Sequence, residues 1–140
     1  METLRWTLVL AIVAKVAALG GQPNPPAWPS SVRVFSPGDT DIEDSIAEAY
    51  YTNGGHDPPN HGQFSNDRYA FLFKPGTYDV DCPVGYYTQI LGLGKQPSDV
   101  TFVSPRGVYS QEQDFSQAGA LCTFWRSAEN FRNNATYKWY

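Results

Sequence analysis

The sequence has few of the residues that build metal and redox sites. Its 140 residues include two cysteines and two histidines, whereas a structural zinc site needs four converging ligands. His56, Asp57 and His61 lie within one polar loop, and no fourth ligand follows at a suitable spacing. We therefore expect no metal site and no cofactor. Because both histidines belong to one loop, a Ser-His-Asp or Cys-His catalytic arrangement is not expected either.

Basic residues and long apolar runs are also scarce. Ten lysines and arginines stand against 14 aspartates and glutamates, which gives a net charge of −4. A chain of this balance lacks the basic surface that holds phosphates, so we expect no nucleic-acid partner. No apolar stretch reaches the roughly 20 residues that a membrane-spanning helix requires, so we expect no membrane span.

The first 20 residues have the order of a secretory signal peptide. Arg5 precedes the short apolar run 6–14, and small residues follow from Ala17 to Gly21. A basic start, a short apolar stretch and a small-residue exit are typical of a cleaved leader. Glu2 and Lys15 depart from that pattern, and a buried helix is the alternative. We expect residues 1–20 to be a signal peptide and the protein to be secreted.

Passage through the secretory route would permit two modifications. Cys82 and Cys122 are able to form a disulfide that closes a loop of about 40 residues, worth roughly 4 kcal/mol. The alternative is two separately buried thiols. Asn134, in the triplet Asn134-Ala135-Thr136, is an N-glycosylation acceptor.

The rest of the chain divides into a short linker and one domain. Residues 21–31 are rich in proline, which fixes φ and removes a backbone donor, so they predict an extended linker. Residues 32–140 have the length of a single domain. That domain begins with a predicted strand at Val32–Phe35.

The sequence predicts one short amphipathic helix after this strand. Thr40 and Glu43 have the spacing of a capping box, in which each side chain binds the other residue's amide. Ile42, Ile46 and Tyr50 recur every four residues and form one apolar stripe. The glycines that follow Asn53 are expected to end the helix.

Short strands and tight turns are predicted beyond residue 67. Tyr69–Phe73 is apolar throughout, as in a strand buried on both faces, and the next five residues form a turn. Further short strands are predicted at 86–93, 100–103, 121–125 and 130–131. Strand starts at Tyr69, Gln89, Val100 and Leu121 are 20, 11 and 21 residues apart, and two of these gaps suit a solenoid coil.

An ordered set of motifs connects these elements. A strand at Val32–Phe35 is followed by the acidic helix start 38–46, the Pro-Gly-Thr-Tyr turn of 73–78 and the Gly-Leu-Gly turn of 91–94. This set resembles the N-terminal cap and first coils of the pectate-lyase-like right-handed parallel β-helix proteins. That superfamily includes polysaccharide lyases, glycoside hydrolases such as exo-β-1,3-glucanases, and phage tailspikes. Residues from Val84 to Ser127 resemble a secreted bacterial subgroup.

The resemblance implies a mainly β fold: the N-terminal part of a right-handed parallel β-helix with one short capping helix. A solenoid buries a continuous core with at least about three repeats, so we expect residues 32–140 to be the truncated beginning of a longer domain. It also implies a carbohydrate-directed protein whose partner is a polysaccharide or a cell-surface glycan. If the full-length protein is an enzyme, it is expected to be a polysaccharide lyase or a glycoside hydrolase, with its catalytic groups on later coils.

Aromatic residues are the candidate contact points for sugar. Tyr86, Tyr87 and Trp125 are the rings that we expect at a carbohydrate-binding surface, although most aromatics of a small domain are buried. No residue is assigned a catalytic role, because one acidic pair, Asp79 and Asp81, does not build a glycosidase site. A structural or adhesive extracellular β-helix without catalysis is the alternative function.

Overall fold

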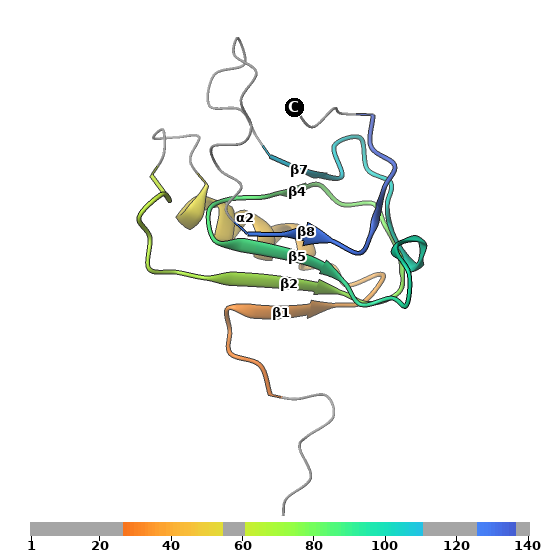
Figure 1. Cartoon of the computed structure of the whole chain (residues 1–140), viewed down its shortest axis with the longest axis horizontal. Helices are drawn as coiled ribbons and strands as arrows, with labels where there is room; N and C mark the ends of the chain where they lie inside the picture. Colours follow the sequence, from red (N-terminus) through yellow and green to blue (C-terminus); the bar gives the residue numbers. More distant parts are fainter. Residues whose placement is uncertain (1–26, 55–60, 111–125, 137–140) are drawn as a thin grey trace, which may run out of the picture.

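The computed structural model describes residues 27–54, 61–110 and 126–136 (Figure 1). These residues are mainly β, with one α-helix and one short 3-10 helix. The elements in chain order are β1 (Val32–Phe35), α2 (Ile42–Asn53), β2 (Tyr69–Phe73), β3 (Gly76–Tyr78), β4 (Cys82–Pro83), β5 (Thr88–Gly92), η1 (Pro97–Asp99), β6 (Val100–Phe102), β7 (Val108–Tyr109), β8 (Ala128–Glu129) and β9 (Arg132–Asn133).

All strand pairs in these residues are parallel. The largest sheet has the order β1-β2-β5-β8, and its strands run in one direction in Figure 1. The other two sheets have the orders β3-β6-β9 and β4-β7. Each pass of the chain, first β2-β3-β4 and then β5-β6-β7, gives one strand to every sheet, and we call such a pass a coil. This arrangement is consistent with the predicted parallel β-helix.

Aromatic side chains from successive coils pack together inside the stack. Phe73 is the centre of this core: its ring centroid lies 5.3 Å from Phe35, 5.0 Å from Tyr78 and 4.9 Å from Phe102. The last two contacts are edge-to-face, the geometry that the ring quadrupole favours. Phe131, after β8, extends the series, with its ring 5.3 Å from that of Phe102.

Helix α2 contributes its apolar stripe to the same core. Ile42, Ile46 and Ala49 are buried, and the helix packs against β4. The predicted stripe was therefore right for the two isoleucines, while Tyr50 is only half-buried. None of the helices in the described ranges is long and apolar enough to cross a membrane.

The predicted capping box is wrong. The N-cap residue is Asp41, which forms no side-chain cap, because its carboxylate accepts a 2.7 Å hydrogen bond from Arg33 of β1. The Glu43 carboxylate accepts a hydrogen bond from the amide of Asp81 instead of turning back to its own helix. Both side chains bind neighbouring strands and loops, which supply partners that local sequence spacing does not reveal.

Several strand predictions also need correction. Tyr69–Phe73 is a strand, but it is buried on one face only, at Phe71 and Phe73. Val100 begins a strand of the second sheet, so the 11-residue gap lies within one coil. Asn130 is a corner with φ +57 between β8 and β9, and its amide donates to the carbonyls of Gly92 and Gly94. The predicted strand 121–125 lies outside the described residues.

Asn53 joins the end of α2 to the coils. Its carbonyl accepts a 2.6 Å hydrogen bond from the amide of Tyr86, and its side-chain amide donates to the carbonyl of Asp67. Gly85 packs directly against the Asn53 backbone. The helix is thereby fixed to the segments before β2 and β5.

The buried hydroxyl of Tyr78 makes stability sensitive to alkaline pH. This residue is 2% exposed, and its hydroxyl contacts the carbonyls of Phe35 and Lys74. Burial, followed by the charge of Asp39, raises the pKa of Tyr78 to about 12 from 10. Because the folded pKa exceeds the unfolded value, this contribution is complete below pH 10 and declines as the pH rises towards 12.

We therefore expect Tyr78→Phe to flatten the fall in unfolding free energy between pH 10 and 12, measured by urea denaturation. The matched control is Tyr51→Phe, since Tyr51 is 86% exposed. An alkaline decline equally steep in wild type and in Tyr78→Phe would contradict the assignment.

Candidate functional site

The structure separates the three predicted carbohydrate-binding aromatics. Tyr86 is 1% exposed, so its ring is in the interior, and its prediction as a surface contact is corrected. Its amide is held by the end of α2, which turns this part of the chain inward. Tyr87 is half-buried with φ +56, and its hydroxyl donates to the carbonyl of Gln63. Trp125 lies outside the described residues.

The predicted disulfide is not found among the described residues. Cys82 is a free thiol in the core with no exposed surface, and Cys122 lies outside the described ranges. Burial, followed by the charge of Asp81, raises the pKa of the Cys82 thiol. A thiol held protonated is a weak nucleophile, so Cys82 has the character of a core residue.

The predicted glycosylation site lies on the surface near β9. Asn134 and Thr136 are exposed, and the backbone amide of Asn134 donates to the carbonyl of Phe102. The Thr136 hydroxyl donates to the carbonyl of Pro105. Glycosylation of Asn134 stays a prediction.

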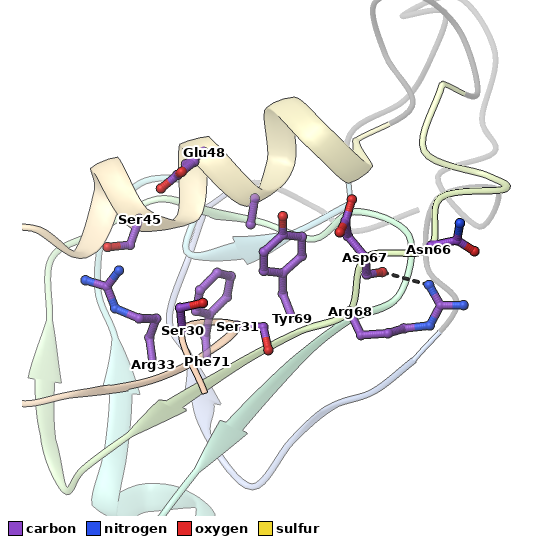
Figure 2. Close-up of a pocket in the computed structure, with 11 residues that line it drawn as sticks. Ser30, Ser31, Arg33, Ser45, Glu48, Asn66, Asp67, Arg68, Tyr69 and Phe71 are labelled. Carbon is purple, nitrogen blue, oxygen red and sulfur yellow. Dashed lines mark hydrogen bonds between the residues drawn. The ribbon is translucent and has the colours of Figure 1, made fainter. Parts of the chain in front are cut away.

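A cleft lies between helix α2 and the strands β1 and β2 (Figure 2). Its volume is about 500 Å³. We call it the helix–sheet cleft. Its lining residues are Ser30, Ser31, Arg33, Ser45, Glu48, Ala49, Asn66, Asp67, Arg68, Tyr69 and Phe71. Most of them carry hydroxyl, amide or charged groups.

The cleft combines polar walls with the half-buried ring of Tyr69, while the ring of Phe71 is 1% exposed. Figure 2 shows Glu48 and Ser45 on the helix, with Tyr69 and Phe71 of β2 across from them and Asp67 at one end. The rings of Tyr69 and Phe71 are stacked at 6.4 Å between centroids. Carboxylates and hydroxyls beside aromatic rings suit a sugar, whose hydroxyl groups need partners and whose C–H faces pack on rings.

The cleft is better suited to binding a sugar than to cleaving a glycosidic bond. Hydrolysis requires a general acid whose proton is held by an apolar environment, opposite a second carboxylate. Glu48 and Asp67 are both exposed to solvent. Within the described ranges, histidine, cysteine and acidic side chains form no group of three or more that could hold a metal ion, while His56 and Asp57 lie outside those ranges.

Two other polar segments serve the fold. The carboxylate of Asp99 accepts hydrogen bonds from the amides of Lys95 and Gln96, so the Gly-Leu-Gly segment before them is a closed corner of the coil. Asp81 uses its carboxylate to accept from the amide of Arg106. Asp79 is exposed.

Comparison with known proteins finds an exo-β-1,3-glucanase and two solved structures of sacteLam55A that are similar to this chain. An exo-β-1,3-glucanase of Streptomyces sp. (strain SirexAA-E / ActE) is 33% identical over an alignment of 152 positions, gaps included, which covers 99% of this chain and 24% of that protein. The solved structure of sacteLam55A from Streptomyces sp. SirexAA-E has a TM-score of 0.61 and 39% identity over 75% of this chain and 18% of that one.

A variant of sacteLam55A in complex with glucose matches equally well. Its TM-score is 0.61 at 37% identity, covering 76% of this chain and 18% of the variant. This chain therefore spans about a quarter of the length of the curated relative and less than a fifth of the solved chains. No protein-family model matches the sequence.

These relatives overturn the resemblance to pectate-lyase-like proteins. The curated relative is named as an exo-β-1,3-glucanase, and none of the three matched proteins is named as a pectate lyase. That resemblance depended on the proline-glycine turn, the glycine-rich turn and the capping helix. These motifs form the corners of a parallel coil stack and cover its end. Such features follow from the fold, whereas the chemistry follows from the site.

Sequence reasoning missed the helix–sheet cleft. Glu48 appears in the sequence as an ordinary polar position of the helix, and Asp67 as part of a polar loop. Their common location depends on how α2 lies across β1 and β2. The one available sequence signal was the polar face of the amphipathic helix. That face does not reveal which strands lie across the cleft from it.

Proposed function

We propose that this chain is the capped beginning of a right-handed parallel β-helix in an exo-β-1,3-glucan hydrolase, and that its helix–sheet cleft binds β-1,3-glucan. The observation that carries the proposal is the 33% identity to an exo-β-1,3-glucanase along 99% of this chain. The 39% identity to a solved relative at a TM-score of 0.61 supports the same fold.

The cleft supplies the binding chemistry for this proposal. Carboxylates of Glu48 and Asp67 accept hydrogen bonds from sugar hydroxyls, and the half-buried ring of Tyr69 offers apolar surface for the C–H face of a sugar ring. Because both carboxylates are exposed, the chain by itself is expected to bind glucan without cleaving it. Secretion of the protein, with residues 1–20 as its signal peptide, is part of the same proposal.

Titration of the chain with laminarihexaose in a calorimeter tests the proposal. We expect saturable binding that Glu48→Gln weakens about tenfold, because a hydrogen bond to a charged group is lost. The matched control is Asp44→Asn, on the same helix but outside the cleft, which should bind like wild type. Cellohexaose, with β-1,4 linkages, should bind more weakly.

Two results would contradict this function. A folded chain that binds no laminarihexaose would favour a structural or adhesive β-helix. Release of reducing sugar from laminarin by this chain alone would show that its own carboxyl groups are sufficient for catalysis.

A further inference from the structure

A second hollow lies at the N-terminal ends of strands β1, β2 and β5. It has a volume of about 250 Å³, and we call it the arginine groove. Its lining residues are Ser31, Val32, Arg68, Tyr69, Ala70, Tyr87, Gln89 and Arg126. Two of the eight are arginines, and none is acidic, although the chain as a whole carries a net charge of −4.

The two arginines are brought together by three successive levels of the largest sheet. Tyr69 of β2 pairs with Thr88 of β5, so Arg68 and Tyr87 are neighbours just before those strands. The guanidinium carbon of Arg68 lies 3.6 Å from the centroid of the Tyr87 ring. Arg126, just before β8, approaches the same ring at 5.9 Å. The groove therefore exists only because the coils stack in this register.

Arg68 is held in a fixed orientation. Its Nη1 group donates hydrogen bonds to the carbonyls of Ser65 and Asp67, at 2.8 and 2.7 Å. Tyr87, which stacks against it, is held by its own hydroxyl bond to Gln63. Fixing a guanidinium in advance lowers the entropy cost of binding a ligand.

Neither groove arginine is neutralised by a carboxylate in the part of the chain that the structure describes. Arg33 forms the one ion pair found there, with Asp41. The carboxylate of Asp67 accepts a hydrogen bond from the Ser65 hydroxyl, and that of Glu129 accepts from Ser127 and from Gln89 of the groove. The groove is thus lined by two arginines that form no ion pair among the described residues.

We propose that the arginine groove binds an anionic glycan, one that bears sulfate or carboxylate groups on its sugars. The planar donor fork of arginine matches an oxyanion of this kind. Val32 and Ala70 provide apolar surface for a sugar C–H face, and Ser31 and Gln89 provide partners for its hydroxyls. This ligand is distinct from the neutral β-1,3-glucan assigned to the helix–sheet cleft. Ser31, Arg68 and Tyr69 line both hollows, so the two proposals are separated by Arg126, which lines only the arginine groove, and Glu48, which lines only the cleft.

The test compares three glycans that separate charge from sugar backbone: laminarin, sulfated laminarin and polyglucuronic acid. Binding to the full chain is measured by affinity electrophoresis and calorimetry in 50 mM and 500 mM NaCl. We expect at least one charged glycan to bind about tenfold more tightly than laminarin at low salt, with that preference falling at high salt.

Variants locate the site. Arg126→Gln is expected to weaken binding of the charged glycan about tenfold and to leave laminarin binding unchanged. Arg126 lines the arginine groove and not the helix–sheet cleft. The matched control is Arg132→Gln, which removes the same charge from exposed strand β9. Arg68→Lys keeps the charge but loses the fork, and should weaken binding to a lesser extent.

Three outcomes would overturn the proposal. If charged glycans bind no more tightly than laminarin, the arginines do not recognise anionic groups and the proposal is wrong. An equal loss in Arg132→Gln and Arg126→Gln would mean general charge attraction instead of a site. Sodium sulfate that binds as tightly as sulfated laminarin would show recognition of the free oxyanion without the sugar.

Discussion

Replacing Phe73 by alanine is expected to lower the free energy of unfolding by about 3–5 kcal/mol. Phe73 has no exposed surface and contacts aromatic rings from β1, β3 and β6. Its removal takes away the transfer free energy of the ring and leaves a cavity among side chains from different coils. Such neighbours are fixed by their own strand pairing and cannot collapse far into the space.

Urea denaturation followed by circular dichroism measures this change. The matched control is Phe64→Ala, since Phe64 is 84% exposed and should change the unfolding free energy by less than about 0.5 kcal/mol. If the Phe73 variant does not fold, Phe73→Leu, which leaves a smaller cavity, gives a measurable loss of the same sign. Equal stability of the Phe73 and Phe64 alanine variants would contradict the core assignment.

Gly85→Ala is expected to lower the free energy of unfolding by about 3 kcal/mol. A Cβ atom at Gly85 would overlap the carbonyl oxygen of Asn53 and approach its carbonyl carbon to 2.9 Å. That oxygen is the acceptor for the amide of Tyr86, so relieving the overlap lengthens a buried hydrogen bond. The substitution thereby separates helix α2 from the start of the second coil.

Gly38→Ala is the matched control for this effect. Gly38 has φ +89 but nothing within 4 Å of an added Cβ, so alanine there costs only backbone strain, about 1 kcal/mol. Thermal and urea unfolding of both variants compare steric overlap with strain. A Gly85→Ala protein as stable as Gly38→Ala would show that α2 can shift away from the second coil at little cost.

Local sequence signals predicted the elements whose causes are local. The strand Val32–Phe35 and the strand Tyr69–Phe73 were confirmed, because β-branched and aromatic runs between turn residues favour strands. The isoleucines of α2 were correctly assigned to its buried face. The spacing of apolar residues predicted the buried face correctly in segments that face the core on one side.

Elements that depend on contacts between distant parts of the chain could not be predicted from the sequence. Strand β3 begins at Gly76, inside what looked like a turn, and strand β4 has only two residues, Cys82 and Pro83. Strands this short are stabilised by pairing with the next coil and not by their own composition. In the same way, Tyr86 and Tyr87 are adjacent in sequence, yet one is in the interior and the other packs under Arg68.

The sequence by itself determined the scarcity of metal ligands, the acidic balance, the short strands with tight corners and the amphipathic helix. These follow from composition and from the periods of a strand and a helix. Only the tertiary structure decided which side chains meet. The helix–sheet cleft and the arginine groove each combine residues from separate passes of the chain, and parallel stacking brings those passes into one register.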